Sequence, residues 1–181
     1  MTDDRFRTHV AAMVPRLGRF AMALTRSRAD AQDLVQMTCE RALARAEQWQ
    51  PDTRLDSWLF RIMQTIWLNE LDARRVRSAA AARQAPLEEP GVDGEGVAET
   101  RLLLSRVRRI VEELTDVERA TLNLVCVDGL SYREAADVLN VPIGTVMSRL
   151  ARARLRLMER LESAERAAGG NIVRFRSGPD D

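Results

Sequence analysis

The chain has 181 residues, of which 45% are hydrophobic and 30% are charged. That is enough apolar material for one ordinary domain or two small ones, and it excludes a wholly disordered chain. Aromatic residues make up only 4%, so we expect an all-α protein and not a β-sandwich or β-barrel. The formal net charge of +1 excludes nucleic-acid coating through bulk charge, and any DNA contact must come from local clusters.

Metal, membrane and catalytic functions are also disfavoured. Cys39 and Cys126 lie far apart and His9 is the single histidine, so no zinc or iron–sulfur spacing exists. We expect both cysteines to be small core residues, with no metal or other cofactor. The N-terminus is charged and no apolar run reaches the ~18 residues of a membrane span, which predicts a soluble cytoplasmic protein. No catalytic triad, glycine-rich phosphate loop or pair of inward carboxylates is present, so we expect no enzymatic activity.

An acidic segment divides the chain. Residues 78–99 contain one arginine against five acids, together with two prolines and three glycines. Because such a segment offers little to bury, we predict a flexible acidic linker. It separates an N-terminal helical domain over residues 1–77 from a C-terminal helical domain over residues 100–164, and residues 165–181 form a tail.

The N-terminal domain has the apolar spacing of three antiparallel helices. The first contains Pro15, which should kink the helix or restart it. The second begins near Asp30 and ends before Pro51. Its predicted apolar stripe consists of Val35, Cys39, Ala42, Ala46 and Trp49. The third runs from about Ser57 to Arg77, and the short connections predict a small three-helix bundle.

The C-terminal domain contains two capping-box patterns. The spacing Thr-x-x-Glu at 115–118 predicts the start of a helix that runs to Val127. The spacing Ser-x-x-Glu at 131–134 predicts a second, short helix. After a turn at 140–142, a last helix continues to about Ser163. A short helix, a tight turn and a longer helix are the helix-turn-helix arrangement, in which the second helix enters the major groove of DNA.

The last helix separates an apolar stripe from an arginine-rich one. At about 100° per residue, Val146, Leu150, Ala153 and Leu157 share one face. The polar stripe contains no acid and consists of Thr145, Ser148, Arg149, Arg152 and Arg156. This composition suits bidentate contacts to guanine and the neutralisation of phosphates, so we predict that these five residues bind duplex DNA. The alternative is that the arginines form only the solvated face of an amphipathic helix.

Two parts of the sequence resemble a known family. Residues 128–154 resemble region 4 of bacterial RNA polymerase sigma factors of the extracytoplasmic function (ECF) group, and residues 33–38 followed by 58–62 resemble region 2. The resemblance covers about residues 10–160. It implies that the chain binds core RNA polymerase and directs it to promoters. Region 4 would then bind the −35 element as duplex, and region 2 would bind the −10 element as a single strand and aid strand opening.

The resemblance also assigns roles within region 2. It implies polymerase contacts at Asp33, Leu34, Gln36 and Glu40. The loop at residues 48–55 corresponds to the loop that holds a flipped base in this family. The residues implied to bind the single strand are Gln48, Trp49, Asp52, Arg54, Trp58, Arg61, Thr65, Asn69, Arg74, Arg75 and Arg77.

Several of these assignments leave alternatives open. Trp58 lies among polar residues on its helix, and it either stacks on an unpaired base or packs under the preceding loop. The loop at 48–55 is otherwise a plain helix connection, and Asp33 is otherwise a first-turn acid that complements the helix dipole. The arginines near the end of the third helix either contact phosphates or complement the dipole there.

Some residues depart from the family pattern. Gln64 and Thr65 stand where members often carry Arg-Asn, and Met147 stands where members often carry a basic residue. These departures affect the individual base contacts and not the docking mode.

Two other functions compete with promoter recognition. A sigma-like decoy that captures an anti-sigma protein would be expected to lose the arginine stripe, which this chain retains. An ordinary helix-turn-helix regulator would not be expected to resemble region 2. The sequence shows no recognisable autoinhibitory domain, so we expect a separate anti-sigma protein that covers surface on both domains.

Overall fold

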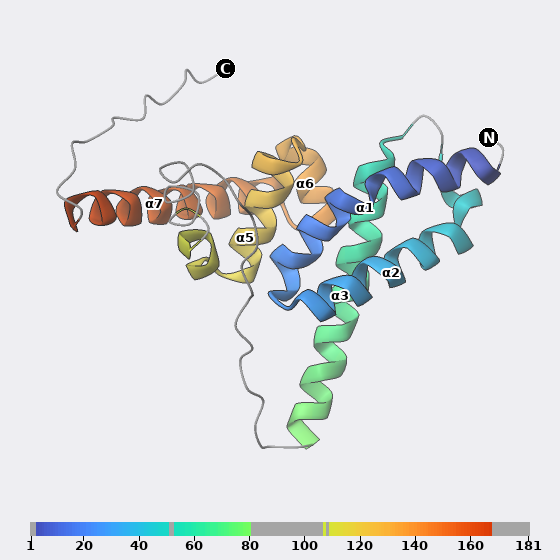
Figure 1. The fold of residues 1–181 in the computed structure, drawn as a ribbon, viewed down its shortest axis with the longest axis horizontal. Helices are drawn as coiled ribbons and strands as arrows, with labels where there is room; N and C mark the ends of the chain where they lie inside the picture. The colour runs from blue at the N-terminus through green and yellow to red at the C-terminus, as the bar shows by residue number, and fades with distance from the viewer. Residues whose placement is uncertain (1–2, 51–52, 81–106, 108, 168–181) are drawn as a thin grey trace.

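The computed structural model describes residues 3–50, 53–80, 107 and 109–167, and this part of the chain is all-α, as predicted (Figure 1). The N-terminal half consists of α1 (Asp3–Thr25), α2 (Arg28–Ala44), a short 3-10 helix (Ala46–Gln48) and α3 (Leu55–Ala80). The C-terminal half consists of α5 (Asp116–Leu122), a π-helix (Asn123–Val127), α6 (Tyr132–Leu139) and α7 (Ile143–Ala167). Residues 109–113 form a further helical segment. Most of the predicted linker and tail, at 81–99 and 168–181, lies outside the described residues.

The first two helices meet at a sharp turn. α1 continues through Pro15, and its ribbon changes direction along its length, in agreement with a kink and not a restart (Figure 1). Arg26 then adopts a left-handed conformation with φ of 61°, and the Ser27 hydroxyl accepts a hydrogen bond from the Asp30 N–H at 3.2 Å. This serine cap starts α2 at Arg28, slightly before the predicted start near Asp30.

The predicted apolar stripe of α2 is rotated from the observed one. The residues that α2 buries are Ala31, Leu34, Thr38 and Ala42. Of the predicted stripe, Ala42 is buried, while Val35 and Cys39 are only half-buried at its flank. The interior accepts Thr38 because its hydroxyl donates to the Leu34 carbonyl oxygen at 2.7 Å, which leaves no unsatisfied polar atom there.

Both predicted capping boxes of the C-terminal half are confirmed. In each, the hydroxyl of the first residue accepts from the backbone N–H of the glutamate, and the glutamate carboxylate accepts from the backbone N–H of the first residue. The helix that begins after Thr115 widens into the π-helix before it ends at Val127. Because a π-turn shifts the phase of the side chains, Cys126 is exposed and not in the core as predicted.

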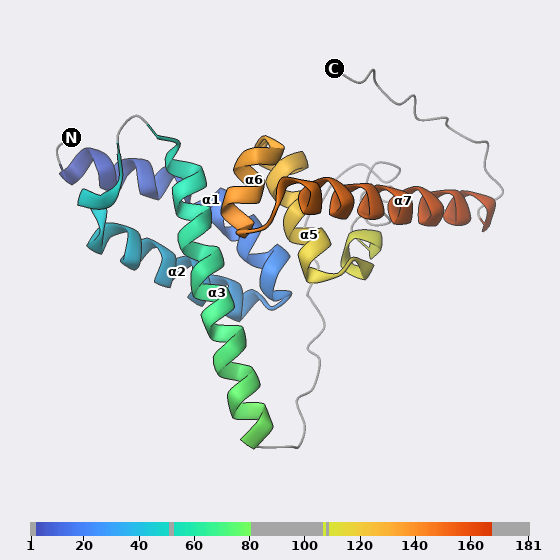
Figure 2. The same cartoon turned by 180° about the vertical axis from the view of Figure 1, so that it is seen from behind.

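The two halves of the molecule share one core. α1 packs against α5 and the π-helix, and α3 packs against α6 (Figures 1 and 2). The apolar core includes Phe20 and Leu59 from the first half and Leu124, Leu130 and Val138 from the second. The predicted domains are therefore packed together in the described part of the chain.

Ion pairs and hydrogen bonds also join the two halves. Arg16 of α1 donates through Nε to Oδ1 of Asp128 at 2.9 Å, and its Nη1 lies 3.0 Å from Oδ2 of Asp56. The Asp128 side chain is fully buried, and Arg19 forms a second ion pair with it at 3.3 Å. Arg119 donates through Nε to the Ala23 carbonyl oxygen at 2.7 Å. These contacts hold α1 and the start of α3 against the end of the π-helix, and α5 against α1.

Candidate nucleic-acid and polymerase-binding surfaces

The helix-turn-helix is formed by α6, the turn at 140–142 and α7. Asn140 ends α6 in the left-handed conformation with φ of 52°, and the Pro142 carbonyl oxygen accepts from the Thr145 N–H at 2.9 Å to start α7. Val146 and Ala153 on α7 have no exposed surface, so the predicted apolar face packs inward. The N-terminal part of the polar face, with Ser148 and Arg152 exposed, is thereby turned away from the core.

The polar stripe of α7 is not uniform in exposure. Ser148 and Arg152 are exposed, while Thr145 and Arg149 are half-buried. Burial, followed by repulsion from Arg152, lowers the pKa of Arg149 from its usual value. The N-terminal part of α7 therefore presents hydroxyls and guanidinium groups at the positions from which a recognition helix contacts base edges.

Arg156 differs from the other members of the stripe. Its Nη1 donates to Oε2 of Glu118 at 2.7 Å, and this bond joins α7 to α5. Glu118 is 3% exposed. The Thr-x-x-Glu spacing indicated only the capping role of Glu118, and no local spacing indicated that it also holds an arginine on another helix.

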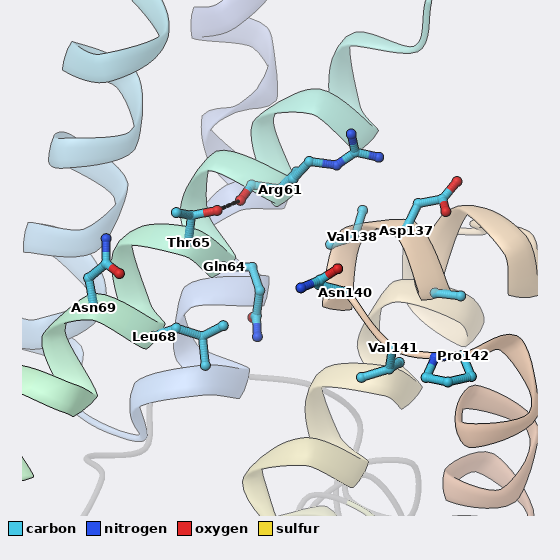
Figure 3. Close-up of a pocket in the computed structure, with 11 residues that line it drawn as sticks. Arg61, Gln64, Thr65, Leu68, Asn69, Asp137, Val138, Asn140, Val141 and Pro142 are labelled. Atoms are coloured by element: carbon cyan, nitrogen blue, oxygen red, sulfur yellow. Dashed lines mark hydrogen bonds between the residues drawn. The ribbon is translucent and has the colours of Figure 1, made fainter.

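The polar face of α3 lies opposite the helix-turn-helix. Arg61, Thr65 and Asn69 line one side of a cavity of about 680 Å³, here called the α3–α6 cavity. Figure 3 shows these residues on α3, with residues of α6 and of the turn at 140–142 on the other side. Three of the residues predicted to bind the single strand, Arg61, Thr65 and Asn69, are thus brought together on one face, and that face looks toward the other half of the molecule.

Arg54 is already engaged by carboxylates. Its Nε and Nη2 donate to the two oxygens of Asp56 at 3.1 and 2.7 Å, and its Nη1 donates to Oε1 of Glu134 at 3.0 Å. Burial opposes ionisation of Asp56, yet the hydrogen bonds from Arg54 and from the Ser57 N–H hold the pKa of this carboxyl below its usual value. Arg54 therefore bridges the start of α3 and the first turn of α6.

The two tryptophans near the loop pack around Phe6. The Phe6 ring centroid lies 5.6 Å from that of Trp49 and 6.2 Å from that of Trp58. Trp58 is half-buried, which supports the packing alternative for its indole. The sequence predicted no partner for Phe6, because both tryptophans lie more than 40 positions away in the chain.

A second, smaller cavity lies beside the loop and is here called the loop cavity. Its volume is about 350 Å³. The residues that line it are Gln48, Gln50, Thr53, Arg54, Ser57, Trp58, Arg61 and Glu134. The Ser57 hydroxyl is buried and has no hydrogen-bond partner among the described residues. Asp52, which was also predicted to contact the single strand, lies outside the described residues.

The arginines at the far end of α3 have separate environments. Arg74 pairs with Asp30 of α2 at 3.1 Å and lies over the Trp67 ring at 5.5 Å, so it braces α2 against α3. Arg75 is exposed and pairs with Asp72. Because α3 extends to Ala80, Arg74 and Arg75 precede its last turn, and the helix-dipole alternative is wrong for both. The side chain of Arg77 lies outside the described part.

The surface of α2 carries the residues predicted to contact polymerase, with one correction. Asp33, Gln36 and Glu40 are exposed, and Gln36 Nε2 donates to Oε1 of Glu40 at 2.9 Å. Leu34 is 2% exposed and packs in the core, so its assignment to this surface is wrong for the folded chain. α2 begins at Arg28 and Asp30 occupies its first turn, so Asp33 is not the first-turn acid.

Comparison with known proteins agrees with this architecture. The family model described as "Sigma-70, region 4" matches residues 104–157, and the model "Sigma2 domain of PhyR" matches residues 10–64. The ECF RNA polymerase sigma factor EcfG of Rhodopseudomonas palustris (strain TIE-1) is 34% identical over 157 residues, which cover 85% of this chain and 83% of EcfG. This chain belongs to the ECF RNA polymerase sigma factors.

Other relatives of this sigma factor agree with the assignment. SigM of Mycobacterium tuberculosis (strain ATCC 25618 / H37Rv) is 35% identical over 157 residues, covering 86% of this chain and 74% of SigM. The Bartonella quintana sigma factor RpoE, solved in complex with the anti-sigma factor NepR, has a TM-score of 0.75 and 26% identity, with 87% of this chain and 97% of RpoE covered. CnrH, solved with the cytosolic domain of CnrY, has a TM-score of 0.58 and 29% identity, with coverage of 87% and 88%.

Neither a membrane-spanning helix nor a metal-binding cluster occurs among the described residues of this sigma factor. None of its helices there combines the length and the apolar content needed to cross a lipid bilayer. The same residues contain no group of three or more histidine, cysteine, aspartate or glutamate side chains arranged to hold a metal ion.

Proposed function

We propose that this sigma factor binds core RNA polymerase and directs it to promoters through two surfaces, one for duplex and one for single-stranded DNA. The exposed arginine stripe of α7, set on a helix-turn-helix with its apolar face buried, is the observation that carries the proposal. The chain acts by binding in the cytoplasm, where polymerase and promoters are, and performs no chemistry of its own.

The duplex surface is the N-terminal part of α7. Arg149 and Arg152 lie one turn apart on the stripe, with Thr145 and Ser148 ahead of them. Arginine forks bind guanine edges in a bidentate manner, and hydroxyls contact bases or phosphates. We assign these four residues to the −35 element.

The single-strand surface begins at the loop cavity. Its volume suits a single ring system, and the polar side chains of Gln48 and Arg61 in its lining supply hydrogen-bonding groups for a base edge. From there, Arg61, Thr65 and Asn69 continue along α3 on one exposed face. We assign the loop cavity to one flipped base of the −10 element and this face of α3 to the adjoining strand.

The polymerase surface is on α2. Asp33, Gln36 and Glu40 form an exposed polar row, and Met37 beside them is 40% exposed. A polar row next to an exposed methionine has the mixed character of a protein interface. We assign this face of α2 to the contact with core polymerase.

Run-off transcription tests the proposal directly. Core polymerase is combined with this chain on promoter fragments whose −35 element is intact or scrambled, and we expect a discrete transcript that depends on both the chain and the intact element. Arg154 is exposed on α7 outside the stripe, so Arg154→Ala serves as the matched control for Arg152→Ala. A chain that does not bind core polymerase would contradict the proposal.

An anti-sigma protein is the proposed regulator. Two of the similar structures are complexes of a sigma factor with NepR and of CnrH with the cytosolic domain of CnrY. We propose that a separate protein of this kind holds this chain until it is released. Affinity purification from unstressed cells should recover a small protein in near-equal amount, with polymerase recovered only after induction. Equal recovery of polymerase in both states, without such a companion, would contradict this proposal. It would mean that the activity of the sigma factor is regulated through the amount of it that is synthesised.

A second candidate function is that of a sigma-like decoy. The match of residues 10–64 to the Sigma2 domain of PhyR favours it, because a PhyR has been solved as an anti-anti-sigma factor bound to NepR. A decoy would bind an anti-sigma protein without binding polymerase or −35 duplex. The retained arginine stripe of α7 favours the sigma factor, and the transcription assay separates the two functions.

A further inference from the structure

One carboxylate oxygen joins the start of α5 to the recognition helix. Oε2 of Glu118 accepts from the Thr115 N–H at 3.1 Å and from the Thr115 hydroxyl at 2.8 Å. The same oxygen accepts from Nη1 of Arg156 at 2.7 Å. Glu118 is therefore both a capping residue and the partner of an arginine 38 positions later in the chain.

The negative charge of Glu118 is not required for the cap. A glutamine at the same position of a capping box accepts the same backbone hydrogen bond. Although burial opposes ionisation, the hydrogen bonds from Thr115 and the charges of Arg156 and Arg152 keep the pKa of Glu118 below its usual value. The carboxylate is thus charged. Its charge is not needed to cap α5, but it strengthens the bond to Arg156.

Arg156 lies on the DNA-facing stripe but far from its base-reading end. It follows Thr145 by 11 positions, which is about 16 Å along the helix axis. In a helix-turn-helix the first residues of the recognition helix contact base edges, and side chains farther along face the backbone. An unrestrained guanidinium at this position would reach a phosphate at any sequence.

We propose that Glu118 is a positioning residue that withholds Arg156 from DNA phosphates, and that it thereby lowers the sequence-independent part of the duplex affinity. This rests on the proposed duplex-binding function of α7. A phosphate contact by Arg156 would strengthen binding to every DNA sequence equally. Without that contact, the base contacts of Arg149 and Arg152 determine which sequence the protein binds.

The dependence of duplex binding on salt measures the number of phosphate contacts. Each contact adds about 0.9 to the slope of log affinity against log salt concentration. In Glu118→Gln the cap is retained and Arg156 is released, so we expect the slope to steepen by about 0.9 on matched and scrambled −35 duplexes alike. Between 50 and 200 mM salt this is about a threefold additional loss of affinity.

A double-mutant cycle separates this effect from general electrostatics. Arg156→Gln alone should leave the slope unchanged, because the wild-type side chain is already withheld. The double variant Glu118→Gln/Arg156→Gln should also return to the wild-type slope, whereas simple loss of a repulsive carboxylate would persist in it. Thermal unfolding followed by circular dichroism checks that all three variants are folded.

Two results would overturn the inference. One is an unchanged slope in Glu118→Gln while the wild type still prefers the matched duplex, which leaves the proposed function intact. The other is a shallower slope in Arg156→Gln alone, which would mean that Arg156 contacts DNA despite its partner. A wild-type chain that binds neither duplex would overturn both the proposed function and this inference.

Discussion

The two surfaces assigned to DNA face different surroundings in the free protein. On α7, Ser148 and Arg152 are exposed on a helix whose DNA-facing stripe is turned away from the core. On α3, Arg61 and Thr65 line the α3–α6 cavity, whose other wall is the helix-turn-helix itself (Figure 3). The duplex surface is therefore open to solvent, whereas the single-strand surface lies beside the helix-turn-helix, and we expect the two halves to move apart when a strand binds.

The contacts across the interface between the N-terminal and C-terminal halves explain this difference. Arg16 joins the N-terminal Asp56 to the C-terminal Asp128, and Arg54 joins Asp56 to Glu134. These carboxylates are held close to guanidinium groups that would otherwise attract phosphates. Weakening the contacts should release the single-strand surface and leave the duplex surface unchanged.

Removal of the charge on Asp128 should have the largest effect. In Asp128→Asn, Arg16 and Arg19 lose a fully buried partner, and we expect a loss of about 2–3 kcal/mol in the free energy of unfolding. Removal of one partner from a buried ion pair usually costs about 3–5 kcal/mol. We expect a value at or below the lower end of that range, because Arg16 and Arg19 both keep partial access to water. Denaturant unfolding measures it.

A matched control for this variant is Asp72→Asn. Asp72 pairs with Arg75, and both side chains are more than two-thirds exposed. Such a pair contributes about 1 kcal/mol or less. Equal losses in the two variants would mean that the interface pair has no special role.

On the duplex surface, Arg152→Ala should reduce discrimination between matched and scrambled −35 duplexes by about 1–3 kcal/mol, the value of one bidentate contact to guanine. Binding to core polymerase should be retained, because Arg152 lies on α7 and the proposed polymerase surface is on α2. Fluorescence anisotropy with both duplexes provides the measurement. An equal loss of affinity for both duplexes would mean that Arg152 contacts a phosphate and not a base.

Acid should weaken the contacts between the two halves. The hydrogen bond from Ser131 lowers the pKa of Glu134, and hydrogen bonds outweigh burial to lower that of Asp56, from usual values of 4.5 and 3.8. A carboxyl with a lowered pKa stabilises the folded state above its unfolded pKa, and this stabilisation is lost as the pH falls. We expect stability to be constant from pH 7 to about 5 and to fall below that. The double variant Asp56→Asn/Glu134→Gln should show a smaller fall.

The smallest expected effect is that of Glu134→Gln on the single-strand surface. Glutamine retains the capping box of α6, while Arg54 loses a partially exposed partner. A pair of this kind contributes about 0.5–1 kcal/mol, so affinity for a single-stranded −10 oligonucleotide should rise about two- to fivefold. Glu113→Gln removes the same charge from an ion pair within the C-terminal half, with Arg160, and should leave this affinity unchanged. No increase in Glu134→Gln would mean that Arg54 does not limit access to the strand.

Local patterns in the sequence were sufficient for much of the fold and for the duplex surface. The capping boxes at Thr115 and Ser131 and the two faces of α7 depend on residues within a few turns of one another, so spacing alone determines them. The same holds for the kink near Pro15 and for the order of the helices. Most of the predicted linker, at 81–99, lies outside the described residues, and its first three residues belong to α3.

Only the tertiary structure decided which side of each helix is covered and which charges are paired. Leu34 and Thr38 of α2 face the protein core because α1 and α3 pack on that side of the helix. Phe6 contacts Trp49 and Trp58 across the bundle. Arg54 finds Glu134 at a separation of 80 residues, and Arg156 finds Glu118 at 38. Helical periodicity places a side chain on a face of its own helix, but the partner of that face is set by long-range packing, which no local spacing contains.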